Sequence, residues 1–225
     1  MTKWFNTNYH YIVPEYEPDV QLKLTQNKPL EAFLEAKQQL GIIGKPVIIG
    51  PLSFAKFTKG DYGTISDYVH LLLPLYVQML QELETEGCHW VQMDEPFLVV
   101  GITNQEMQLV ENVYQRFQTC LPKLKIILQT YFDSLENYEQ LIKLPVSGIG
   151  LDFVHGYQDN LANLELYKFP EDKILGVGLV NGRNIWRCNL MDKYELLQKI
   201  FKYVPSERVW IQPSCSLQFT PVSVN

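Results

Sequence analysis

Two adjacent carboxylates, Asp94 and Glu95, stand directly after an apolar run that is typical of a buried strand. The run 90–94 alternates apolar and polar residues with the period of two of a β-strand, and Pro96 ends the pattern by removing a backbone donor. In parallel α/β proteins ligands bind at the carboxyl ends of the strands. We therefore interpret Asp94 and Glu95 as rim residues able to hold a small molecule. The alternative is that Asp94 only caps the following turn.

Further polar residues follow other apolar runs in the same way. Asp152 lies near the end of the run 148–154, Asn181 follows 174–180, and Cys215 follows 208–211. Because the carboxyl ends of parallel strands share one edge, we expect Asp94, Asp152, Asn181 and Cys215 to cluster there. His155 is the best-placed histidine, and we interpret it as a rim residue.

The elements that must position these residues alternate between strands and helices. Helical spacing predicts helices at 28–41, 66–86, 105–120, 134–144, 160–167 and 194–203, and predicted strands lie at 8–13, 46–51, 90–94, 125–130, 148–154, 174–180 and 208–211. The segment 52–59 is predicted to be a loop. Strands this apolar indicate a parallel sheet covered on both faces. The predicted fold class is α/β, an incomplete (β/α)8 TIM-type barrel with about seven strands, forming one partial barrel domain over 1–225.

Composition excludes several classes of partner. The chain has 225 residues, 46% of them hydrophobic, and a formal net charge of −6 with scattered Lys and Arg, so nucleic acid is not an expected partner. No apolar stretch is long enough for a membrane span or a signal peptide. The cysteines Cys88, Cys120, Cys188 and Cys215 are far apart, as in reduced proteins, and we expect a cytoplasmic location.

Several long segments resemble one known family. They are TKWFNTNYHYIVPE at 2–15, VIIGPLSF at 47–54, WVQMDEPFLV at 90–99, QTYF at 129–132, GVGLVNGRNIW at 176–186 and PSCSL at 213–217. These strings resemble the N-terminal barrel of cobalamin-independent methionine synthase. That zinc enzyme moves a methyl group from methyltetrahydropteroyl-polyglutamate to homocysteine. The resemblance runs essentially from end to end.

The resemblance implies that the zinc chemistry lies elsewhere. The family has a second, catalytic barrel that holds the zinc, and laying the two barrels together matches its ligand positions to Tyr131, Asp133, Asp152 and Cys215. Only Cys215 keeps a ligand identity, so we expect a degenerate site, no metal or cofactor in this chain, and no catalytic residue. Asn181 matches the proton-donating histidine and cannot shuttle a proton.

The resemblance also assigns a binding role to Lys3, which matches a lysine that contacts the glutamate tail of the folate substrate. Relative to the family the chain looks truncated at both ends, and its expected partner is the C-terminal catalytic barrel. In one hypothesis the chain is part of the methyltransferase and supplies scaffold and folate-tail binding. In the other it is a stand-alone, non-catalytic binding or remnant protein whose rim carboxylates hold another small molecule.

Overall fold

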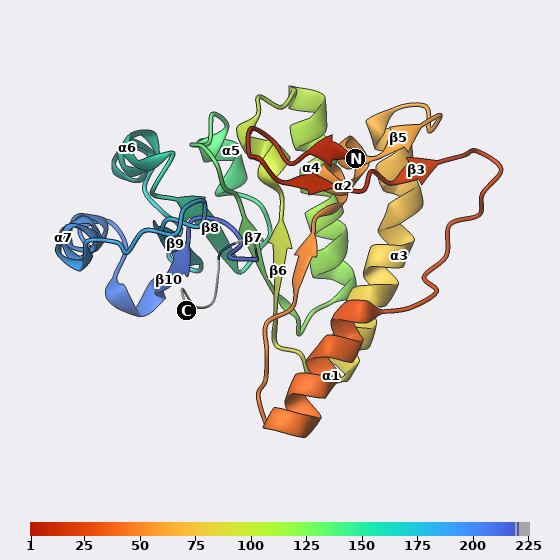
Figure 1. The fold of residues 1–225 in the computed structure, drawn as a ribbon, viewed down its shortest axis with the longest axis horizontal. Helices are drawn as coiled ribbons and strands as arrows, with labels where there is room; N and C mark the ends of the chain where they lie inside the picture. The colour runs from red at the N-terminus through yellow and green to blue at the C-terminus, as the bar shows by residue number, and fades with distance from the viewer. Residues whose placement is uncertain (219, 221–225) are drawn as a thin grey trace. The chain divides into compact units, whose positions relative to one another are not determined.

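The computed structural model describes residues 1–218 and 220, and the chain divides into two compact units (Figure 1). The first unit comprises Met1–Phe97 and Thr103–Ile126, and the second comprises Leu98–Ile102 and the part of the chain from Ile127 onward. Both units contain parallel strands connected by helices, which confirms the α/β class. The organisation of 1–225 as one partial barrel domain stays a prediction.

The first unit begins with short strands rather than with a parallel barrel strand. β1 (Thr2–Lys3) and β2 (His10–Tyr11) pair antiparallel, and β3 (Glu15–Tyr16) pairs with β5 (Lys59–Gly60). The prediction of a buried parallel strand at 8–13 is therefore wrong. The aromatic residues of this stretch form one side of a hairpin, and Ile12 next to it is 85% exposed. Alternating aromatics fit a hairpin as well as a buried strand, so the pattern could not distinguish them.

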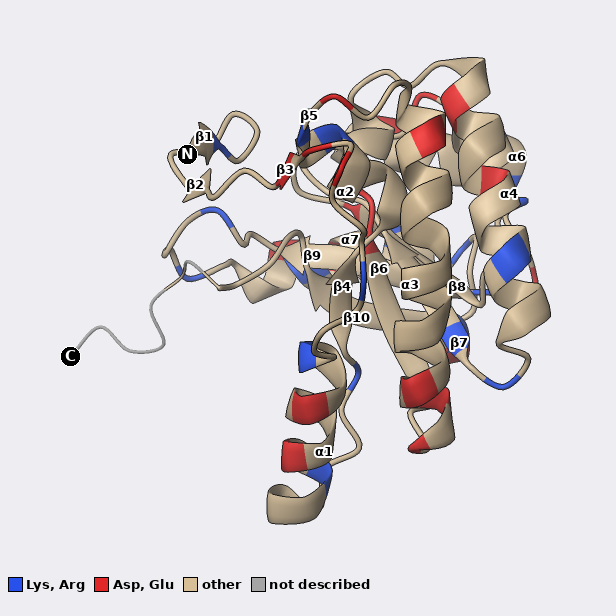
Figure 2. Cartoon of the chain, turned by 90° about the vertical axis from the view of Figure 1, so that its right-hand side faces the viewer, with Lys and Arg blue, Asp and Glu red and all other residues tan. Residues whose placement is uncertain are grey.

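The first unit also contains two parallel strands that pair with each other. β4 (Val47–Ile49) pairs with β6 (Trp90–Asp94), and helices α1 (Lys28–Leu40), α3 (Ile65–Thr85) and α4 (Asn104–Cys120) connect or flank them. Each helix starts at a side-chain cap, and α1 ends at Gly41 in the left-handed conformation, as the sequence predicts. Figure 2 shows acidic and basic residues together along α1.

The segment after β4 is helical, so the prediction of a loop at 52–59 is wrong. Helix α2 (Pro51–Phe57) has proline at its first position, and its first turn is fixed by a side chain that is distant in sequence, Glu95. This cap cannot be recognised from the local sequence. The aromatic side chains of Trp4, Phe5 and Tyr11 pack around Phe57 at the other end of the helix.

The second unit contains four parallel strands in the order β7 (Lys125–Gln129), β8 (Gly148–Asp152), β9 (Ile174–Val180) and β10 (Val209–Pro213). Helices α5 (Tyr138–Leu141), α6 (Tyr157–Tyr167) and α7 (Leu190–Ile200) alternate with them, and the short 3-10 helices are η1 (Pro96–Val99) and η2 (Ser206–Arg208). The first two residues of β7 belong to the first unit. The predicted strands at 125–130, 148–154, 174–180 and 208–211 are confirmed; closure of the strands into a barrel stays a prediction.

Within the described part of the chain, no helix combines the length and apolar character needed to cross a membrane.

Candidate functional site

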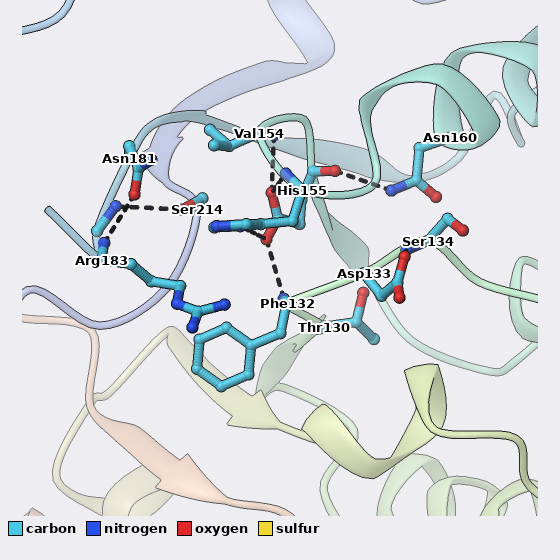
Figure 3. A network of polar contacts seen from close by, with 12 residues as sticks. Thr130, Phe132, Asp133, Ser134, Val154, His155, Asn160, Asn181, Arg183 and Ser214 are labelled. Atoms are coloured by element: carbon cyan, nitrogen blue, oxygen red, sulfur yellow. Dashed lines mark hydrogen bonds and ion pairs between the residues drawn. The ribbon is translucent and has the colours of Figure 1, made fainter. Parts of the chain in front are cut away.

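Asp152, the last residue of β8, organises the rim of the second unit, and Figure 3 labels its partners Phe132, Val154, His155 and Asn160. Its side chain is completely buried, and its Oδ1 accepts hydrogen bonds from the backbone N–H groups of Val154 at 2.7 Å and His155 at 2.8 Å. Its Oδ2 accepts from the backbone N–H of Phe132 at 2.9 Å. The carboxylate therefore ties the turn that follows its own strand to the turn that follows the neighbouring strand β7.

The imidazole of His155 completes this network. Its Nδ1 lies 2.9 Å from Oδ2 of Asp152, and because a carboxylate oxygen accepts, Nδ1 is the nitrogen that carries the proton. Asn160 donates from Nδ2 to the carbonyl of Asp152, which joins α6 to the same strand end. Five protein groups thus bond to this one residue, four of them to its carboxylate. The side chain of His155 is partly exposed, so the network reaches the protein surface.

Phe132 takes an unusual backbone conformation in this network. Its φ is 85°, in a region that non-glycine residues rarely occupy, and its N–H is the group bonded to Asp152. The guanidinium carbon of Arg183 lies 5.3 Å from the centre of the Phe132 ring, within cation–π distance. The rim thus presents an arginine on an aromatic platform.

The loop after β9 that carries Arg183 is anchored to the loop after β10. Asn181 accepts the N–H of Arg183 at its Oδ1, 2.8 Å away, and Gly182 donates its N–H to Oγ of the buried Ser214 at 3.2 Å. A Cβ on Gly182 would lie 2.7 Å from the carbonyl oxygen of Cys215 and 2.8 Å from its Sγ. Only glycine fits so close to the neighbouring loop.

Below this rim, two glutamine side chains cover the glycines of the central strands. Nε2 of Gln212 donates to Oε1 of Gln129 at 2.7 Å, and Nε2 of Gln129 donates to the carbonyl of Thr130. A Cβ on Gly150 would lie 1.8 Å from Oε1 of Gln129, and one on Gly176 would lie 2.2 Å from Nε2 of Gln212. Hydrogen-bonded amide side chains therefore cover β8 and β9 at these glycines.

In the first unit, Glu95 serves helix α2. Its carboxyl group is fully buried and accepts the backbone N–H groups of Leu52 at 3.1 Å and Ser53 at 2.7 Å. Burial raises the pKa of Glu95 to about 7, because desolvation outweighs these hydrogen bonds. Glu95 can therefore gain or lose a proton near neutral pH while it holds the start of a helix.

Asp94 belongs to a row of polar side chains in the first unit. Nε2 of Gln92 donates to Oδ1 of Asp94 at 2.8 Å, and Nζ of Lys45 donates to Oε1 of Gln92 at 2.6 Å. Burial lowers the pKa of Lys45, and the charge of Asp94 partly opposes this. The amide of Gln92 thus connects an ammonium group to a carboxylate. The alternative that Asp94 only caps the following turn stays a prediction.

The rim residues predicted from the sequence fall in both units. Asp152, Asn181 and Cys215 end or follow three adjacent parallel strands of the second unit, whereas Asp94 ends β6 in the first unit and Glu95 follows it. Each lies at or just after the carboxyl end of its strand. A single cluster that includes Asp94 stays a prediction.

The matched ligand positions do not fit a zinc ion. Asp133 is exposed and accepts the N–H of its neighbour Ser134, and both oxygens of Asp152 already accept protein hydrogen bonds. Tyr131 and Cys215 are buried. Within residues 1–218 and 220, no group of three or more His, Cys, Asp or Glu side chains could hold a metal.

Lys3, the predicted tail-binding residue, is exposed in β1, where it pairs with His10 across the hairpin.

Five residues of these networks were not predicted as site residues: Phe132, Arg183, Ser214, Gln129 and Gln212. Arg183 and Phe132 stand within segments that carry the family resemblance, so a search of polar residues just beyond each strand end would have found Arg183. No local pattern predicts the positive φ of Phe132, because it depends on Asp152.

Comparison with known proteins identifies the family. Residues 1–205 match the family described as Cobalamin-independent synthase, N-terminal domain. The parallel strands alternate with helices and carry polar residues at their carboxyl ends, so the protein belongs to the α/β class. The chain belongs to the cobalamin-independent methionine synthase family, as its N-terminal domain.

The relatives named 5-methyltetrahydropteroyltriglutamate–homocysteine methyltransferase include one from Halalkalibacterium halodurans. It is 50% identical over 224 residues, covering 99% of this chain and 30% of that protein. Another, from Listeria monocytogenes, is 50% identical over 224 residues, covering 99% of this chain and 29% of that protein. The chain thus spans about 30% of the length of these relatives.

Among solved structures, a B12-independent methionine synthase from Shewanella sp. W3-18-1 has a similar fold. The TM-score is 0.68 at 16% identity, with 84% of this chain and 59% of that chain covered. A putative vitamin-B12 independent methionine synthase from Listeria monocytogenes gives a TM-score of 0.65 at 15% identity, covering 84% of this chain and 63% of that chain. These likenesses support the fold.

Proposed function

We propose that this chain is the N-terminal part of a cytoplasmic methyltransferase that moves a methyl group from 5-methyltetrahydropteroyl-polyglutamate to homocysteine. The observation that carries the proposal is the 50% identity with a named methyltransferase over 224 residues. The chain supplies scaffold and binding surface, and a second, C-terminal catalytic barrel supplies the zinc chemistry. The poor fit of the matched ligand positions to zinc supports this division.

Lys3 contributes to binding the glutamate tail of the donor. A lysine is a flexible point charge, and each glutamate unit of the tail carries a carboxylate that it can meet without strict geometry. Because Lys3 is exposed, water and salt screen this interaction, and its contribution should be about 0.2–1 kcal/mol.

A chimera tests the proposal. The matched region of the Halalkalibacterium halodurans relative is replaced by this chain, and methyl transfer from the triglutamate donor to homocysteine is measured. We expect activity within about tenfold of the parent, because half of the exchanged residues are identical. A folded chimera without activity, beside an active parent, would contradict the proposal and favour a stand-alone binding protein.

The same chimera tests Lys3. Lys3→Ala should raise KM for the triglutamate donor by up to about fivefold at low salt and leave kcat nearly unchanged, the result expected for lost uniform binding. Lys23→Ala, at another exposed lysine of the first unit, is the matched control and should change neither constant. Equal KM values for Lys3→Ala and Lys23→Ala would remove Lys3 from the binding role.

A further inference from the structure

Arg183 is held in place by three separate devices at the rim of the second unit. The first is the platform: its guanidinium carbon lies 5.3 Å from the centre of the Phe132 ring (Figure 3). An arginine stacked on a ring keeps N–H donors at the edge of the guanidinium plane, where a planar acceptor can meet them. The contact therefore holds the positive charge next to the ring.

The second device is the strained backbone of Phe132. A φ of 85° at a non-glycine residue is strained, and such strain collects at functional sites. The fully buried Asp152 holds this conformation through the N–H of Phe132 at 2.9 Å. A buried carboxylate thus maintains the conformation that places the ring under Arg183.

The third device is the anchored loop. The side chain of Asn181 accepts the N–H of Arg183, and Gly182 is bonded to Ser214 in a position that no Cβ could share. These contacts fix the backbone on which Arg183 stands, so the guanidinium loses little conformational freedom when it binds a partner.

The charge of the loop also favours an anion. Residues 181–191 include Arg183 and Arg187 but no Asp or Glu, in a chain whose formal net charge is −6. This stretch of the chain therefore carries positive charge in an acidic protein.

We propose that Arg183 is a carboxylate-binding residue of this domain. The edge of its guanidinium would donate two parallel N–H···O hydrogen bonds to a substrate carboxylate. This assignment rests on the proposed function, in which both the glutamate tail of the donor and the amino acid homocysteine carry a carboxylate. Guanidinium and carboxylate groups match in this bidentate geometry, which lysine cannot reproduce. Arg183 is thus a second binding position, independent of Lys3.

Equilibrium titration of the 225-residue chain tests the assignment. The probes are γ-linked triglutamate and, in a separate arm, L-homocysteine under reducing conditions, each from about 0.1 to about 20 mM at low salt, followed by NMR. We expect saturable shifts with at least one probe. Arg183→Gln should weaken that binding by about tenfold, and Arg183→Lys should recover only part of it, because it restores the charge but not the paired donors.

Arg187→Gln is the matched control, since it removes the same charge from the same loop. It should change the affinity by less than about twofold. Phe132→Gly is a further variant: glycine accepts the positive φ, so the fold should be kept while the platform is lost, and affinity should fall by about threefold. The probe whose binding Arg183→Gln weakens identifies which substrate supplies the carboxylate.

Three results would overturn the assignment: no saturable binding of either probe, equal affinities for Arg183→Gln and the unmodified chain, or equal losses from Arg183→Gln and Arg187→Gln. None of them bears on methyl transfer by the chimera, which tests the proposed function separately. Conversely, an inactive chimera combined with Arg183-dependent binding would leave the carboxylate position in place and remove the methyltransferase role.

Discussion

The two units bury a carboxyl group in contrasting ways. Glu95 and Asp152 are both completely buried and both stand at or just beyond the carboxyl end of a parallel strand. Glu95 has two backbone donors, and burial raises its pKa to about 7. Asp152 has three backbone donors and the ring of His155. The N–H donors that lie near each carboxyl group, rather than its burial or its position on the strand, therefore determine its role. Glu95 caps a helix, whereas Asp152 organises a rim.

We expect the largest effect from removing the carboxylate of Asp152, which accepts hydrogen bonds from three backbone N–H groups. Asp152→Ala should lower the free energy of unfolding by about 3–5 kcal/mol, because it leaves several N–H groups without an acceptor. Chemical denaturation measures this loss. Asp133→Ala removes an exposed carboxylate from the same rim and should cost less than about 0.5 kcal/mol. Similar losses for the two variants would end the view of Asp152 as the organising group.

Glu95 should make the stability of the first unit depend on pH. Below its ordinary value of 4.5, the group is protonated in folded and unfolded chains alike; above it, the unfolded chain releases the proton first. The free energy of unfolding should therefore fall by about 3 kcal/mol as pH rises from 4.5 to about 7.

Denaturation at a series of pH values measures this fall. Glu95→Gln should flatten the profile over that range, whereas Glu111→Gln, at an exposed position of α4, should leave it unchanged. A profile of the same steepness in the Glu95→Gln variant would show that another group is responsible.

Each unit also contains a buried tyrosine hydroxyl group, for which we expect a smaller effect on stability. The hydroxyl groups of Tyr114 and Tyr138 are buried without a hydrogen-bond partner among the residues that the structure describes. Replacing either by Phe should leave the free energy of unfolding unchanged or raise it by about 1 kcal/mol, since no bond is lost. Tyr76→Phe, which removes a 2.7 Å bond to the carbonyl of Ile49, should instead lower it by about 1 kcal/mol. Thermal unfolding separates these signs, and a loss at Tyr114 or Tyr138 as large as at Tyr76 would reveal an unseen partner.

The smallest expected difference concerns one ion pair in each unit. Lys56 and Glu106 lie 2.5 Å apart with side chains only 21% and 18% exposed, whereas Lys143 and Glu139 lie 2.7 Å apart at 68% and 57% exposure. Lys56→Met should cost about 1 kcal/mol and Lys143→Met about 0.3 kcal/mol, because water screens the exposed pair more strongly. Denaturation at low and high salt should show the larger salt effect for Lys143. Equal costs would mean that burial does not separate the two pairs.

Much of the fold follows from local patterns along the chain. Helical spacing with capping residues predicts α1, α3 and α4, and apolar runs predict the parallel strands of the second unit. The same reasoning failed at 8–13 and 52–59, where the deciding contacts come from elsewhere: the antiparallel pairing of the first residues and the cap that Glu95 provides. Local spacing cannot report the cap of 52–59, which is more than 40 residues away in the sequence. The hairpin partner of 8–13, Thr2–Lys3, is close in the sequence, but alternating aromatic residues fit a hairpin as well as a buried parallel strand.

Residue order and spacing were enough to identify the family, the α/β class, and the placement of Asp152, Asn181 and Cys215 at or after the ends of strands. What those residues do depends on contacts that form only in the folded chain. Folding brings the N–H of Phe132 to Asp152 and the guanidinium of Arg183 to the Phe132 ring. Hydrogen bonds and ring contacts depend on distances of a few ångströms between chain segments that the sequence separates by tens of residues.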